Sequence, residues 1–218
     1  IEECGAALDG PVECLRTDDT SRGVEPATME DTLHWKFQTP YYRRRHHSDV
    51  WVARLEKGFI RAGRYALTPD FQLIEDVISE HAVQRDLAGG FATRRPFLHR
   101  TTFRHVALLG THWCDSHFHW LLDVLPRVGI LAESSVSADE VDRYAIPDTT
   151  IPPHVDALRH LGIRDEECLW MGPRDRIAVA DLILPSLPER RGSPPAWAVT
   201  FLRDRFLPRA VPPEECPE

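Results

Sequence analysis

The stretch from Arg104 to Ser134 constrains the fold more than any other part of this chain. Residues 105–109 form a short run, apolar after its first histidine and closed by Gly110, with the length and branching of a buried strand. Residues 111–118 follow as a polar turn rich in His, Asp and Cys. From His119 the apolar residues recur at helical spacing. The stretch therefore predicts a strand, a histidine-rich turn and a buried helix over 119–133.

The predicted helix has a broad apolar arc and a polar edge. His119, Asp123 and Arg127 recur at every fourth position, so they share the polar edge. Pro126 lies inside the helix, where it removes a backbone donor, and we expect a kink there. Leu122 and Ile130 interrupt the polar edge, so we expect the helix to be covered on most of its circumference. The apolar arc comprises Trp120, Leu121, Val124, Leu125, Val128, Leu131 and Ala132.

Strands and helices follow in a regular order in the rest of the chain. Short β runs separated by Gly, Lys or Pro-Asp predict a meander of hairpins at 50–55, 58–61, 65–68 and 71–74. Later segments predict strands at 144–146, 168–171 and 177–184, and helices at 153–161 and 195–206. This alternation predicts a parallel α/β sheet from about 104 to 184, with the helices packed on it. We expect residues 1–48 to be irregular, 49–208 to form one domain and 209–218 to be a disordered tail.

Composition excludes several classes of protein. A hydrophobic content of 42% is typical of a globular chain, and the formal net charge of −8 argues against general nucleic-acid binding. The five cysteines are scattered without CxxC spacing, which favours neither a zinc ribbon nor a disulfide scaffold. We find no long apolar run and no signal peptide, so we expect no transmembrane segment and a cytoplasmic location, or one at the cytoplasmic face of a membrane.

The helix sequence carries a resemblance to a known family. Residues 119–131 read HWLLDVLPRVGIL, and this segment resembles the signature helix of glycosyltransferase family 61. Asp123 stands where Glu is commoner in that family, which shortens the carboxylate by one methylene. The resemblance covers about residues 50–208. It includes the β-rich segment from Val50, the helix and Leu-Gly-Ile turn that begin at His154, and the helix that begins at Pro194.

The resemblance implies an α/β fold that is the Rossmann-like, acceptor-side N-terminal half of a GT-B-type glycosyltransferase, with a β-rich N-terminal segment. It implies transfer of a sugar from a nucleotide-sugar donor to a glycan or glycoconjugate acceptor, as in polysaccharide biosynthesis. Members of the family also have a donor-binding half with a His-Gly-Ala-Gly type motif, which does not occur in this sequence. A C-terminal donor domain is therefore an expected partner. The implied enzyme is metal-independent and uses no cofactor, with the nucleotide sugar as co-substrate.

Sugar transfer needs a base near the acceptor hydroxyl and positive charge or a dipole near the leaving phosphate. We expect His119 to be the base and Asp123 to hold its imidazole in one tautomer. Arg127 would contact substrate, or pair with Asp123 one turn earlier. In the turn, Trp113 would stack on a sugar ring. The expected substrate-binding residues are His117, Trp113, Asp115 and Arg127.

Two other interpretations remain open. The first is a metal-dependent hydrolase, because His117 and His119 have the HxH spacing of some metal sites. Against it, alternate residues do not share a helix face, and no later HxxH motif follows. Its ligands would come from His112, Cys114, Asp115, His117 and His119. The second is a non-catalytic glycan-binding half-domain that retains only the acceptor face.

Overall fold

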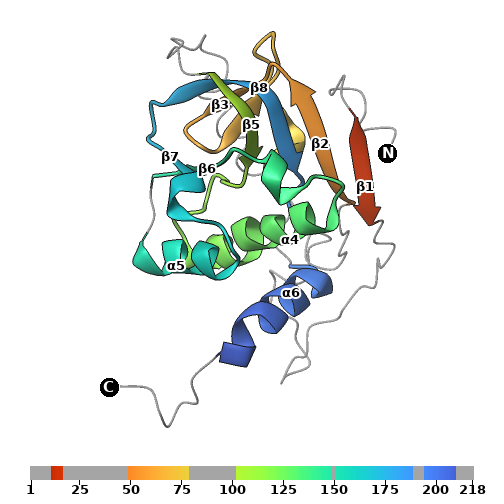
Figure 1. Cartoon of the computed structure of the whole chain (residues 1–218), viewed down its shortest axis with the longest axis vertical. Helices are drawn as coiled ribbons and strands as arrows, with labels where there is room; N and C mark the ends of the chain where they lie inside the picture. The colour runs from red at the N-terminus through yellow and green to blue at the C-terminus, as the bar shows by residue number, and fades with distance from the viewer. Residues whose placement is uncertain (1–10, 17–48, 79–101, 149–150, 189–193, 210–218) are drawn as a thin grey trace, which may run out of the picture.

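The computed structural model describes residues 11–16, 49–78, 102–148, 151–188 and 194–209. These residues form a mixed eight-stranded sheet with helices against it (Figure 1). The strands are β1 (Val12–Arg16), β2 (Val50–Glu56), β3 (Phe59–Arg61), β4 (Tyr65–Leu67), β5 (Thr102–Leu108), β6 (Arg143–Pro147), β7 (Cys168–Met171) and β8 (Arg176–Pro185). The helical segments are η3 (Glu75–Val77), α3 (His117–His119), η4 (Trp120–Val124), α4 (Leu125–Glu133), η5 (Ala138–Glu140), α5 (Pro152–His160), η6 (Asp165–Glu167), α6 (Ala196–Phe206) and η7 (Leu207–Arg209).

The centre of the sheet is parallel, as the sequence predicts. The strand order is β1-β2-β8-β5-β6-β7, and β8, β5, β6 and β7 pair in parallel. At the other edge β2 runs antiparallel to β8, and β1 antiparallel to β2. The β3–β4 hairpin pairs with the first half of β8. The chain thus moves outward from β5 through β6 to β7, then returns to the opposite side of β5 as β8.

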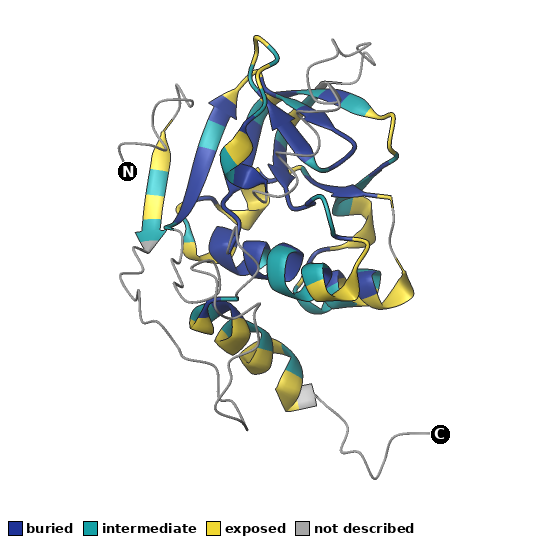
Figure 2. Cartoon of the chain, turned by 180° about the vertical axis from the view of Figure 1, so that it is seen from behind, coloured by how far each residue is buried: buried dark blue, intermediate teal, exposed yellow. Residues whose placement is uncertain are grey.

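Both faces of the sheet are covered, which accounts for the apolar runs at residues 106–109 after β5 passes His105 and at residues 182–184 of β8. Along β5, Val106 and Leu108 pack into one core, while Ala107 and the following Leu109 pack into the other. Apolar residues of α4, α5 and α6 join the second core, and Figure 1 shows these three helices on the same side of the sheet. The β3–β4 hairpin and η3 contribute to the first core. Figure 2 shows the buried residues concentrated in the sheet and on the helix surfaces that face it.

Most predicted elements are present, with two differences near the chain's β-rich start. The segment 71–74, predicted as a strand, forms only an isolated bridge between Leu67 and Leu73. Phe71 has a φ of 67°, a left-handed backbone conformation that interrupts an extended strand. Within the segment 1–48 that we expected to be irregular, Val12–Arg16 forms β1 and pairs with β2. The rest of that segment, and residues 210–218 of the expected tail, lie outside the described residues.

The helix predicted over 119–133 is continuous from His117 to Glu133 but changes its hydrogen-bond register on the way. Residues Trp120–Val124 form a π-helical turn, in which the Leu125 backbone N–H donates to the carbonyl of Trp120. This π-helical turn directly precedes Pro126, whose nitrogen has no hydrogen to donate to the carbonyl four residues earlier. Ala132, assigned to the apolar arc from spacing alone, is exposed near the end of the helix.

Candidate active site at the carboxyl end of β5

The turn between β3 and β4 packs directly against the carboxyl end of β5. Its central residues, Ala62 and Gly63, both have positive φ, as in a type I′ turn. A Cβ at Gly110 would lie 1.9 Å from the carbonyl oxygen of Gly63, so this approach requires glycine at position 110. The same turn carries Arg64, whose Nη1 donates to the carbonyl of His112 at 2.6 Å. The hairpin turn therefore holds the start of the histidine-rich loop.

Arg127 holds the helix to the same strand end. Its side chain is fully buried, and its Nη1 donates to the carbonyls of Leu108, Leu109 and Gly110 at 3.4, 3.2 and 3.0 Å. Its Nη2 donates to the carbonyl of Val77 at 2.8 Å. Burial lowers the pKa of this guanidinium to about 10, and the nearby Asp123 carboxylate opposes that effect. The expectation that Arg127 contacts substrate does not fit this position, and we assign it a structural role.

His119 and Asp123 form a hydrogen-bonded pair at the start of the helix. His119 Nδ1 lies 2.8 Å from Asp123 Oδ2, and the two side chains are 29% and 15% exposed. An ionised carboxylate only accepts hydrogen bonds, so Nδ1 carries the proton and Nε2 is left with its lone pair. The pair thus has the arrangement of a general base and its orienting group. The structure brings together the two residues that the sequence analysis predicted to be catalytic.

Aromatic rings surround His119. Trp113 lies nearly parallel to it, with centroids 6.2 Å apart, and Phe118 meets it edge-on at 5.2 Å. Phe118 is 51% exposed. His112 accepts or donates a 2.8 Å hydrogen bond through Nδ1 with the Tyr65 hydroxyl, and it packs edge-on against Trp113. The loop thereby places two aromatic side chains beside the imidazole that carries the free lone pair.

His117 pairs with a histidine that sequence reasoning missed. Its Nδ1 lies 3.5 Å from Nε2 of His154 in α5, with the ring planes 4° apart. His154 is fully buried and stacks on Trp120 at 4.3 Å. Burial lowers the pKa of His154, and the neighbouring His117 lowers it further. The available signal was its position four residues before Leu158, on the buried face of α5.

The remaining loop residues do not converge on a common point. Asp115 is exposed in the turn, whereas Cys114 is buried in the helix-side core. Within the described ranges, no group of three or more His, Cys, Asp or Glu side chains is arranged to hold a metal ion. The hydrolase interpretation, which required residues 112–119 to share a ligand shell, gains no support from this arrangement.

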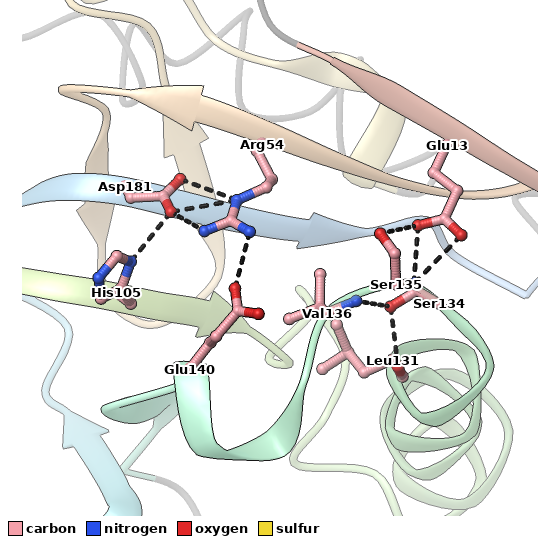
Figure 3. A network of polar contacts seen from close by, with 9 residues as sticks. All are labelled: Glu13, Arg54, His105, Leu131, Ser134, Ser135, Val136, Glu140 and Asp181. Carbon is pink, nitrogen blue, oxygen red and sulfur yellow. Dashed lines mark hydrogen bonds and ion pairs between the residues drawn. The ribbon is translucent and has the colours of Figure 1, made fainter.

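A second His–Asp pair, also missed from the sequence, joins the middle of β5 to β8. His105 Nδ1 is 3.0 Å from Asp181 Oδ2, and Arg54 donates to the same carboxylate through Nε at 3.1 Å (Figure 3). Arg54 also donates through Nη1 to Glu140 at 2.9 Å. Burial alone would raise the pKa of Asp181, but the hydrogen bonds from Arg54 and His105 lower it overall. The sequence signal was a single Asp inside the apolar run of residues 177–184.

Comparisons of this chain with protein-family models, with curated proteins and with solved structures found no match. In the part of the chain that the structure describes, no helix has both the length and the apolar character needed to cross a bilayer. A hydroxyl group placed at Nε2 of His119 would meet a proton acceptor oriented by Asp123, on an imidazole that Trp113 and Phe118 also contact.

Proposed function

We propose that this chain is the acceptor-side part of a glycosyltransferase in which His119 accepts the proton of the acceptor hydroxyl. The observation that carries the proposal is the hydrogen bond between His119 and Asp123, which leaves Nε2 as the free lone pair. The resemblance of residues 119–131 to the signature helix of glycosyltransferase family 61 supports the same assignment.

The position of the pair also favours ligand binding. His119 lies beyond the carboxyl end of a parallel strand and near the start of a helix, the place where ligands bind in many α/β domains. Trp113 and Phe118 flank the imidazole and would pack against the C–H face of an acceptor sugar. This arrangement suits a hydroxyl-bearing ring better than a small ion.

The proposed reaction is a single group transfer. The acceptor oxygen forms a bond to the anomeric carbon of a nucleotide sugar, the hydroxyl proton passes to Nε2 of His119, and the nucleoside diphosphate leaves with the bonding electron pair. Asp123 stabilises the resulting imidazolium. We further propose that the described α/β fold is the N-terminal half of a GT-B-type enzyme, whose second half would bind the nucleotide sugar without a catalytic metal.

The test is turnover by the protein expressed from its complete gene, measured as nucleoside diphosphate released from a panel of nucleotide sugars in the presence of glycan acceptors. We expect His119→Ala to lower kcat by ~10²–10⁴-fold, the usual contribution of a general base. Asp123→Asn should cost less, because the ring keeps its place. His160→Ala, a histidine of α5 that bonds the Arg205 carbonyl, is the matched control and should leave kcat unchanged.

Two results would contradict the proposal. One is the absence of turnover with every nucleotide sugar in the panel. The other is a His119→Ala variant whose turnover per folded molecule equals that of the unaltered protein, which would make His119 a structural residue.

A further inference from the structure

A pocket of about 740 Å³ is lined by Arg104 and His105 of β5, by residues of β2 and β8, and by the segment that follows β4. This volume is within the range of about 300–1,000 Å³ typical of small-molecule sites. Its wall includes the second His–Asp pair, His105 and Asp181, together with Arg54. Nothing in the proposed transfer reaction uses these residues.

The polar wall of the pocket is held in one orientation. Asp181 accepts hydrogen bonds from Arg54 and from Nδ1 of His105, and Arg54 is held on its other side by Glu140 (Figure 3). The three groups come from β2, β5 and β8, so the sheet itself fixes their separation. Because Nδ1 of His105 is engaged, its Nε2 is the ring nitrogen left for a ligand.

Three further polar side chains line the pocket without a partner in the described part of the chain. They are Glu56, Gln72 and Arg104, and all three are exposed. Together they provide one carboxylate, one amide and one guanidinium, so their formal charges cancel. The carboxylate accepts hydrogen bonds, the guanidinium donates them and the amide does both. A phosphate site, in contrast, is lined mainly by donors.

The remaining lining is apolar. Leu55 and Ile74 are buried and Leu73 is half-buried, and all three contribute to the pocket and to the core beneath it. An apolar patch of this kind accommodates the C–H face of a ring, while the polar side chains reach its substituents.

We propose that this pocket binds a neutral, polyhydroxylated ligand, namely a sugar ring. A hydroxyl both donates and accepts, so it satisfies Glu56, Gln72 and Arg104 in one binding mode. A phosphate or carboxylate would instead face the carboxylates of Glu56, Asp70 and Asp181 on the same wall. The inference does not depend on the proposed transferase activity, because none of the pocket residues takes part in the proposed reaction.

The test is a titration of the isotope-labelled full chain, followed by backbone amide chemical shifts. The probes are D-galactose, D-xylose and N-acetyl-D-glucosamine, with sodium phosphate as the anionic comparison. We expect at least one sugar to produce saturable shifts at Ile74, Arg104 and Asp181. Glu56→Ala and Arg104→Ala should each weaken that binding about tenfold, the effect of losing one hydrogen bond to a charged group. Glu166→Gln, an exposed carboxylate on η6, is the matched control and should change nothing.

Several outcomes would overturn the inference. They are the absence of a saturable response to all three sugars at tens of millimolar, saturable binding of phosphate alone, and sugar binding that Glu56→Ala and Arg104→Ala leave intact. His119→Ala should not affect binding at this pocket, so failure here and failure of the proposed transferase are distinguishable. The exposed positions of Glu56 and Arg104 allow both substitutions without loss of the fold, and the amide spectra report this directly.

Discussion

His119 and His154 differ in the groups that surround each ring. The Nδ1–H of His119 has a carboxylate as its partner. The ring of His154 is buried against Trp120, its neighbour is another imidazole, and its Nδ1 has no hydrogen-bond partner among the residues that the structure describes. Adding a charge to His154 is therefore unfavourable in the folded state.

This difference predicts how stability depends on pH. The pKa of His154 is lowered in the folded protein, so below its ordinary value of about 6.5 the unfolded chain binds more protons. The contribution of neutral His154 to the free energy of unfolding is therefore fully present above about pH 6.5, and it is lost as the pH falls from there through the folded pKa. His154→Phe keeps a ring on Trp120 and should flatten this dependence, as measured by urea denaturation between about pH 8 and pH 5. Parallel curves for the two proteins would contradict the assignment.

Arg127 gives a second prediction at the residue scale. Arg127→Met should destabilise the fold by about 2–4 kcal/mol, because the carbonyls of Gly110 and Val77 lose donors in a buried place. Arg127→Lys should recover only part of this, since one ammonium group does not reproduce the planar guanidinium. Urea denaturation of the three proteins is the measurement. A Lys variant as stable as the unaltered protein would show that the charge alone suffices.

At the scale of elements, the contact between α4 and α6 depends on a glycine. Gly129 lies within α4, where alanine would ordinarily stabilise a helix by about 1 kcal/mol. A Cβ at this position would lie 2.8 Å from the ring of Phe201 in α6. The ring, or the whole of α6, would have to move. Gly129 therefore sets how closely these two helices pack.

We expect steric crowding to outweigh helix propensity here. Gly129→Ala should lower stability by about 1–3 kcal/mol, the usual cost of overpacking. In a Phe201→Leu background the same substitution should be neutral or stabilising. A double-mutant cycle by thermal denaturation measures this coupling. Additive effects would show that the Phe201 ring moves aside without cost.

At the scale of the whole molecule, polar contacts join segments that are distant in the chain. The Arg54–Asp181–His105 network connects β2, β8 and β5, and it extends to Glu140 in η5. Glu13 of β1 accepts hydrogen bonds from the backbone N–H and hydroxyl of Ser135, just after α4 (Figure 3). These contacts hold the antiparallel edge of the sheet to the parallel centre and its helices.

Asp181 should therefore contribute to the stability of the entire fold. Asp181→Asn should cost about 1–3 kcal/mol at neutral pH, because partly buried donors on Arg54 and His105 lose an ionised acceptor. The pKa of Asp181 is lowered in the folded protein. The ionised carboxylate therefore stabilises the fold fully above the ordinary aspartate pKa of about 3.9, and this stabilisation is lost as the pH falls from there through the folded pKa. The variant should thus lose less stability than the unaltered protein on acidification.

Urea midpoints at neutral and acidic pH measure this prediction. The matched control is Asp165→Asn, which removes an ion pair with Arg159 on the surface and should have little effect, because solvent screens such pairs. Equal effects of Asp181→Asn and Asp165→Asn would show that the partly buried network stabilises the fold no more than a surface ion pair does.

The sequence by itself determined the features that follow from local spacing. The alternation of apolar runs and helical periods predicted β5, β6, β7 and β8 and their parallel arrangement, because an amphipathic segment must bury its apolar side against a neighbour. It also placed His119 and Asp123 within reach of each other, since side chains four residues apart lie on one helix face.

Only the tertiary structure decided which side chains meet across long separations. Spacing placed Arg127 on a polar edge, but the carbonyls at the end of β5 and at Val77 give it a buried position. His105 and Asp181, and likewise His117 and His154, come together because strand and helix packing brings them there. Periodicity specifies the face on which a residue lies but not what lies opposite, and that is set by the order of the strands and the packing of the two cores.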